Sequence, residues 1–136
     1  MGKTKIVYPE LSYRVVGALF DVFNDIGYGH RERIYQRAVA NRLRELNIPS
    51  KEQLPTNVVF HGLPTGNHYL DFLIDEKLVL ELKQGHRIQR IAIDQVNGYL
   101  RSTKLALGII ATFMPHGVTF MRLLNLPDFK SIRTHP

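Results

Sequence analysis

The stretch YLDFLIDEKLVLELKQG, residues 69–85, decides how this chain folds, because it joins two apolar strand-like segments by a short polar turn. Side chains alternate between the two faces of a strand. Six large apolar residues then fall on one face of the predicted hairpin: Leu70, Phe72, Ile74, Leu78, Leu80 and Leu82. The charged residues Asp71, Glu81 and Lys83 fall on the opposite face.

The register of this hairpin follows from its apolar face. With residues 75–77 as a three-residue loop, residue 74 pairs with 78, 72 with 80, 71 with 81 and 70 with 82. A two-residue loop at Glu76-Lys77 would pair residue 71 with 82 and mix charge into the apolar face, which the burial of that face forbids. The predicted register therefore sets Asp71 directly across from Glu81.

Two carboxylates on neighbouring strands repel each other, so a cation is expected between them. Lys83 can neutralise only part of this charge, and a hard divalent cation with oxygen ligands would neutralise the rest. The arrangement predicts a Mg²⁺ site that the backbone carbonyl of Leu82 could complete, with positions left for water and a phosphate oxygen. Lys83 could then orient or deprotonate the attacking water, or stabilise the pentavalent phosphate.

The same spacing also fits an exposed sheet face with an ordinary Glu81–Lys83 pair and a solvated Asp71. Because D-x9-E-x-K is a short pattern with a high false-positive rate, it does not choose between these two interpretations by itself.

The rest of the chain supplies the other elements of one domain, residues 1–136. Apolar residues at helical spacing predict helices at 8–26, 31–46 and 88–102. Strand formers predict strands at 52–60, 69–74, 78–83, 106–113 and 118–124, with turns at 64–67 and 115–117. The order ααβββαββ indicates an α/β or α+β fold, with a mixed central β-sheet flanked by helices. Only the two termini look loose.

Composition narrows the function classes. The 136 residues include 18 Lys and Arg against 12 Asp and Glu, a net charge of +6 and a pI near 9.8, which favours a polyanionic partner. The chain has no cysteine, so thiolate zinc sites and a Cys nucleophile are excluded and a cytoplasmic location is expected. No segment predicts a membrane span, and the six histidines show no zinc-binding spacing.

Three motifs in chain order carry a family resemblance. Residues 29–35 read G-x-x-E-x-x-Y, Asp71 is followed by Glu81-Leu82-Lys83, and residues 95–100 read Q-x-x-x-Y-L. Together they resemble the PD-(D/E)XK nuclease superfamily, and within it the GxxExxY family. The resemblance covers about residues 8–125, and Leu70 stands where the superfamily's Pro would be.

This resemblance implies a restriction-endonuclease-like core of order αβββαβ. It also implies that Asp71 and Glu81 bind metal, that Glu32 is an additional acidic ligand, direct or through water, and that Lys83 is catalytic. Gln95 would support the site or orient water.

The residues around these motifs have local interpretations of their own. Glu32 begins a helix, where the helix dipole favours a carboxylate with or without metal. Tyr35, one turn on, is expected to pack under the site, and Gln95 and Tyr99 lie one turn apart on the next helix. A Gln on an apolar face needs a polar partner, for which Glu81 or a metal-bound water is suitable.

Basic residues after the strand at 78–83 fit phosphate binding. We expect His86, Arg87 and Arg90 to contact phosphates that neighbour the scissile one. Arg31 begins a row of arginines on the second helix, which equally fits a solvated helix face.

The sequence thus predicts a Mg²⁺- or Mn²⁺-dependent nuclease that hydrolyses DNA, and we expect it to form a homodimer. Two alternatives stay open: a non-catalytic nucleic-acid-binding module that keeps the nuclease fold, and a structural or toxin-partner protein with an accidental acidic face.

Overall fold

The computed structural model describes residues 7–126, and the predicted loose termini lie outside these residues. Within them the element order ααβββαββ is confirmed. The elements are α1 (Pro9–Ile26), α2 (Glu32–Glu45), β1 (Ser50–Phe60), β2 (Leu63–Ile74), β3 (Leu78–Gln84), α3 (Arg90–Thr103), β4 (Leu107–Met114) and β5 (Gly117–Leu124).

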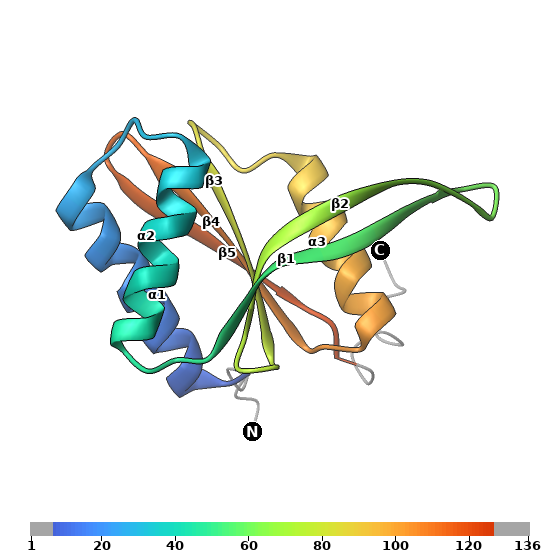
Figure 1. Ribbon diagram of the computed structural model, residues 1–136, viewed down its shortest axis with the longest axis horizontal. Helices are drawn as coiled ribbons and strands as arrows, with labels where there is room; N and C mark the ends of the chain where they lie inside the picture. Colours follow the sequence, from blue (N-terminus) through green and yellow to red (C-terminus); the bar gives the residue numbers. More distant parts are fainter. Residues whose placement is uncertain (1–6, 127–136) are drawn as a thin grey trace, which may run out of the picture.

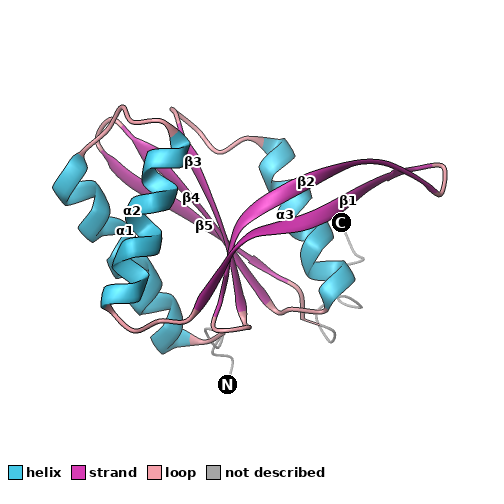
Figure 2. Ribbon diagram, in the orientation of Figure 1, coloured by secondary structure: helices cyan, strands magenta, loops and turns pink. Residues whose placement is uncertain are grey.

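The strands form one five-stranded sheet in the order β1-β2-β3-β4-β5. All neighbours are antiparallel except β3 and β4, which are parallel and joined by α3. Helices α1 and α2 cover one face of the sheet and α3 covers the other (Figure 1), so the chain has the predicted mixed sheet between two helical layers (Figure 2). The β1–β2 hairpin extends beyond the rest of the sheet, past α3.

Two apolar cores lie on opposite faces of this sheet. The first packs α1 and α2 against the five apolar hairpin residues Phe72, Ile74, Leu78, Leu80 and Leu82. The second packs Ala92, Val96 and Leu100 of α3 against Val79 and Ile110. Because Val79 precedes Glu81 and Lys83 by even steps along β3, the charged side of that strand is the side that α3 covers.

The prediction that Leu70 shares a face with Phe72 is wrong. Leu70 belongs to the second core, together with its strand partner Leu54. Between the ladder pairs Glu52–Phe72 and Leu54–Leu70, Gln53 has a left-handed backbone (φ 57°). No Gln53–Asp71 pair forms in the ladder. This break in the alternation turns the outer part of the β1–β2 hairpin toward α3, and Asp71 lies at the bend.

The turn predicted at residues 64–67 is also wrong. These residues belong to β2, and the chain reverses at His61-Gly62 instead, between the paired residues Phe60 and Leu63. Both turn residues have positive φ, 53° and 77°, as a two-residue hairpin turn of the primed type requires. The predicted turn at 115–117 is shorter by one residue, because Gly117 pairs with Met114 and begins β5.

The three-residue loop between β2 and β3 is confirmed. Asp75 and Glu76 have φ of 53° and 58°, and the backbone N–H of Lys77 donates to the carbonyl of Ile74 at 3.0 Å. Leu78 then pairs with Ile74, so the central hairpin has the register that its apolar pattern predicts.

None of the helices within residues 7–126 combines the length and the apolar composition needed to cross a bilayer.

The close packing of α3 on β4 gives a prediction about stability. A Cβ added at Gly108 would lie 2.6 Å from Cγ1 of Val96, whereas nothing lies within 4 Å of one added at Gly17 in α1. We expect Gly108→Ala to lower the free energy of unfolding by about 1–3 kcal/mol. Gly17→Ala should raise it by about 0.5–1 kcal/mol, because alanine favours the helix.

Urea unfolding of both variants beside the wild type measures these changes. Equal effects of the two substitutions would show that the approach of α3 to β4 is not tight.

Candidate active site

The site lies where β2 separates from β3. The ladder between these strands contains only the pairs Ile74–Leu78, Leu73–Val79 and Phe72–Leu80. Beyond it β2 continues to pair with β1, while β3 pairs with β4 up to Gln84. After Leu80, the edge of β3 that faces β2 therefore has no strand partner in the ladder.

Beyond the end of the ladder, carboxylate side chains accept the backbone hydrogen bonds. The backbone N–H of Leu82 donates to Oδ2 of Asp71 at 2.7 Å, and the backbone N–H of Asp71 donates to Oε1 of Glu81 at 3.1 Å. The predicted backbone pairs of residues 71 with 81 and 70 with 82 are absent from the ladder. The predicted closeness of the two acidic side chains is nevertheless present, because each carboxylate binds the backbone of the opposite strand.

Glu32 is brought to the same strand from α2. Its Oε2 accepts a hydrogen bond from the backbone N–H of Gln84 at 3.2 Å. Since N–H groups two residues apart in a strand point to the same side, Gln84 and Leu82 direct theirs toward the same edge. Glu32 and Asp71 thus bind successive N–H groups along one edge of β3, although their residues are distant in sequence.

The charge balance at this point is negative. Glu81 is almost fully buried, with 3% of its side chain exposed, and Nζ of Lys83 lies 3.4 Å from its Oε2. Asp71 is partly buried beside it. One lysine thus faces two carboxylates in a setting where water screens their repulsion poorly.

The pKa values of both acids respond to this environment. Burial, with the charge of Glu81 next in effect, raises the pKa of Asp71 to about 7, although the hydrogen bond from Leu82 opposes the shift. Burial also raises the pKa of Glu81, and the charge of Lys83 opposes that shift most strongly. The site therefore takes up protons more readily than exposed carboxylates do, as expected where negative charge lacks a counterion.

His68 is a site residue that the sequence did not single out. Its Nε2 lies 3.8 Å from Oε2 of Glu81. Burial lowers the pKa of His68, as does the charge of Lys83, while Asp71 opposes them. Strict alternation along β2 would place residue 68 on the face opposite Asp71. The bend near Gln53 instead places the His68 ring beside Glu81, on the face of the acidic pair.

These residues suit a divalent cation in chemistry, although they do not yet surround one. Within residues 7–126, no group of three or more His, Asp or Glu side chains is already arranged to hold an ion. The carboxylates instead bind backbone N–H groups and Lys83. The uncompensated charge fits a site that gains a cation, and so does the buried Nε2 of His68, which has no hydrogen-bond partner among the described residues.

The remaining predicted residues are placed as follows. Tyr35 is fully buried, donates from its hydroxyl to the carbonyl of Gly27 at 2.6 Å and stacks on Phe113 with 4.0 Å between ring centroids. Gln95 and Tyr99 are partly buried on α3. Among the described residues, Gln95 makes no hydrogen bond to the acidic pair.

The basic residues predicted to bind nucleic acid lie on the surface. His86, Arg87 and Arg90 are exposed after β3, and Arg31 is exposed at the start of α2. Arg90 already forms an ion pair with Asp94 at 3.1 Å, whereas the ring of His86 lies 6.4 Å from that of Tyr28.

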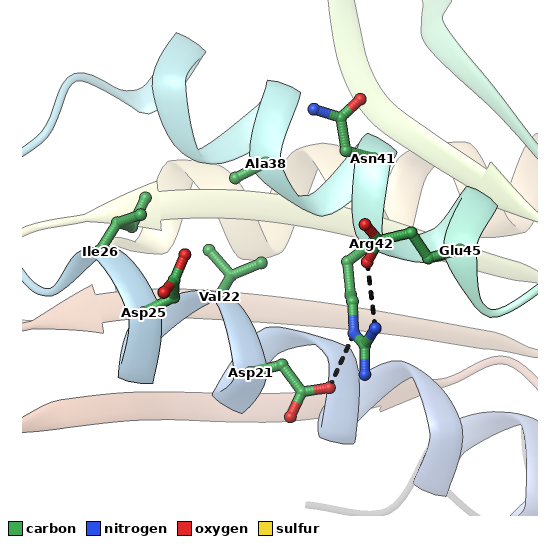
Figure 3. Close-up of a pocket in the computed structure, with 8 residues that line it drawn as sticks. All are labelled: Asp21, Val22, Asp25, Ile26, Ala38, Asn41, Arg42 and Glu45. Carbon is green, nitrogen blue, oxygen red and sulfur yellow. Dashed lines mark hydrogen bonds and ion pairs between the residues drawn. The ribbon is translucent and has the colours of Figure 1, made fainter.

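A separate pocket lies between α1 and α2 (Figure 3). Arg42 crosses it, with Nε 2.9 Å from Asp21 and Nη1 3.0 Å from Glu45. Its lining comes only from these two helices and its arginine is paired with its own acids, so it shares no residue with the carboxylate site.

Comparison with known proteins identifies a family and a similar fold. A family model described as the PD-(D/E)XK nuclease superfamily matches residues 9–123. The crystal structure of SSO0001 resembles this chain with a TM-score of 0.53 and 17% sequence identity, covering 75% of this chain. That match supports the fold, and this chain spans about half (55%) of the length of SSO0001.

A second solved structure is an alkaline exonuclease (LHK-Exo) from Laribacter hongkongensis, with a TM-score of 0.40 and 10% identity, covering 96% of this chain and 77% of its own. No curated protein matches the sequence.

The raised carboxyl pKa values predict how stability depends on pH in metal-free buffer. Because the pKa of Asp71 rises from 3.8 to about 7 on folding, the folded state binds more protons between these values. Stability should therefore be highest at the acidic end and fall as pH rises toward 7. Asp71→Asn keeps an acceptor for Leu82 without a charge, and should exceed wild-type stability at pH 8 by about 1–2 kcal/mol.

Thermal unfolding from pH 5 to 8 in the presence of EDTA measures this difference. Asp75→Asn, in the exposed loop of the same hairpin, is the control and should follow the wild-type profile. Identical profiles for Asp71→Asn and wild type would show that Asp71 carries no unfavourable buried charge.

Proposed function

The chain belongs to the PD-(D/E)XK nuclease superfamily, and from this premise we propose that it is a metal-dependent nuclease that hydrolyses DNA. The observation that carries the proposal is the pair Asp71 and Glu81, held by backbone N–H groups at the strand separation with Lys83 beside them. The motif at residues 29–35 further supports membership of the GxxExxY family.

Asp71 and Glu81 would hold Mg²⁺ or Mn²⁺, together with the backbone carbonyl of Leu82. The N–H of Leu82 points toward Asp71, and the N–H and C=O of one strand residue point to the same side. The carbonyl of Leu82 is therefore directed into the same gap. Glu32 binds the backbone two residues further along, a placement that suits contact with the ion through water.

When bound, the ion would lower the pKa of a coordinated water and stabilise negative charge on the phosphoryl oxygens. Nζ of Lys83 lies 3.4 Å from Oε2 of Glu81, and the lysine side chain is partly exposed. Its ammonium could therefore reach a substrate phosphate or the attacking water. In this role Lys83 balances the charge that develops as the phosphate is attacked.

Gln95 is proposed to orient a water at the site. It lies on α3, the helix that covers the charged side of β3, and it is partly buried. Its amide makes no hydrogen bond in the described part of the chain, so it is available for a contact through water. Tyr99 and Tyr35 support the two helices that flank the site.

The DNA is proposed to run over the exposed residues His86, Arg87 and Arg90, with Arg31 on the neighbouring helix end. These residues follow β3 directly, so phosphates next to the scissile one would meet them. The net charge of +6 favours association with a polyanion. We further propose a homodimer, in which two copies would address the two strands of a duplex.

Cleavage assays, together with thermal unfolding in the presence and absence of Mn²⁺, test the proposed function. Glu81→Gln and Asp71→Asn should each lower the rate of DNA cleavage in Mn²⁺ by at least about 100-fold, because both remove a charge that holds the ion. Labelled single-stranded, duplex and branched DNA should be compared. Mn²⁺ should raise the unfolding temperature of the wild type and not that of the Asp71→Asn/Glu81→Gln double variant.

Asp75→Asn is the matched control and should cleave and respond to Mn²⁺ like the wild type. Loss of cleavage with intact metal binding in a variant would assign that residue to catalysis. If the wild type neither cleaves nor responds to metal yet binds DNA in a salt-dependent manner, the chain is a non-catalytic nucleic-acid-binding module instead.

The DNA-binding surface is tested by salt dependence of affinity. In the uncleaving Glu81→Gln background, Arg87→Ala should weaken binding to any DNA sequence and reduce the slope of log K against log salt by about 1. Arg122→Ala, on the edge strand β5, is the control and should leave the slope unchanged. Equal slopes for both variants would place the DNA elsewhere.

A further inference from the structure

We propose that His68 supplies a nitrogen ligand to the cation held by Asp71 and Glu81, and that the site therefore prefers Mn²⁺ to Mg²⁺. This inference rests on the metal site of the proposed function. It assigns a further ligand and a metal preference.

The position of the imidazole is the first argument. Nε2 of His68 lies 3.8 Å from Oε2 of Glu81, which is too long for a hydrogen bond. Two donors at about 2.1 Å from one ion lie about 3 Å apart when adjacent and about 4 Å apart when opposite. The observed separation falls between these limits, so one ion can contact both atoms with only small side-chain movements.

The state of this nitrogen is the second argument. Nε2 of His68 is buried and has no hydrogen-bond partner among the described residues. Leaving a buried polar atom without a partner costs about 1–3 kcal/mol, so such an atom favours a partner from outside the chain, a water or an ion. A cation bound next to Glu81 would be such a partner.

The surrounding charges favour a neutral imidazole that acts as a donor to metal. The ammonium of Lys83 already lies 3.4 Å from the same Oε2 of Glu81. A second cation on His68 would share that oxygen with Lys83, and the two positive charges would repel each other. The neutral ring keeps a lone pair for coordination.

The backbone holds the ring at this place. Thr56 donates from its hydroxyl to the carbonyl of His68 at 2.8 Å, and the two residues pair in the β1–β2 ladder. The ring therefore approaches Glu81 from a fixed strand and not from a flexible loop.

A nitrogen donor changes which ion the site selects. Carboxylate, carbonyl and water ligands suit Mg²⁺ well, whereas imidazole favours transition metals. A site that joins His68 to Asp71, Glu81 and the carbonyl of Leu82 should bind Mn²⁺ more tightly than Mg²⁺. Removal of the imidazole should then lower affinity for Mn²⁺ selectively.

The test combines calorimetry with pulsed electron paramagnetic resonance of bound Mn²⁺, which detects a directly coordinated nitrogen. His68→Phe keeps the ring volume without the nitrogen, and His116→Phe, in the exposed β4–β5 turn, is the matched control. We expect ¹⁴N coupling in the wild type and the control and none in His68→Phe. Mn²⁺ affinity should fall about tenfold or more in His68→Phe, with Mg²⁺ affinity little changed.

Each outcome has a distinct meaning, provided circular dichroism shows that His68→Phe is folded. Mn²⁺ bound with equal affinity and spectrum in wild type and His68→Phe overturns the role of His68 and leaves the proposed nuclease site in place. An absence of Mn²⁺ binding in the wild type itself overturns the metal site and, with it, the proposed function.

Discussion

The separation of β2 from β3 after three residue pairs is the constraint on which the site depends. A strand that loses its partner leaves backbone N–H groups without a ladder, and these groups need acceptors. Here the acceptors are carboxylates: Asp71 takes the N–H of Leu82 and Glu32 takes that of Gln84. The hydrogen bonds that complete the edge of β3 therefore also hold acidic groups at fixed positions.

Placing Asp71 and Glu81 together lowers the stability of the folded state when both are ionised. Asp71 and Glu81 bind each other's strand, so neither can move away from the other, and both have raised pKa values in their buried setting. A chain under selection for stability alone would place neutral residues here. Under the proposed function, a divalent ion would remove the repulsion, and Lys83 would remain to act on the substrate.

Most of the fold could be predicted because the apolar pattern of residues 69–85 allows one register, and Ile74–Leu78 and Phe72–Leu80 pair accordingly. The face of Leu70 and the place of His68 could not, since both depend on the left-handed backbone of Gln53, which no sequence pattern marks. Glu32 could be predicted only from its motif. Local spacing could not place it at the site, because the contact of α2 with β3 joins residues distant in sequence. The turn was misplaced because residues 64–67 are typical turn formers that here belong to a strand.

Asp71 and Glu81 form a site at the strand separation that lacks positive charge, and we propose that a divalent ion completes it. Calorimetric titration with Mn²⁺ at pH 6.5, in two buffers of different ionisation enthalpy, tests this most directly. We expect saturable binding with release of protons from Asp71, whose pKa is raised to about 7, and loss of both in the Asp71→Asn/Glu81→Gln double variant. Binding without proton release, or equal binding by the double variant, would show that these two carboxylates do not hold the ion.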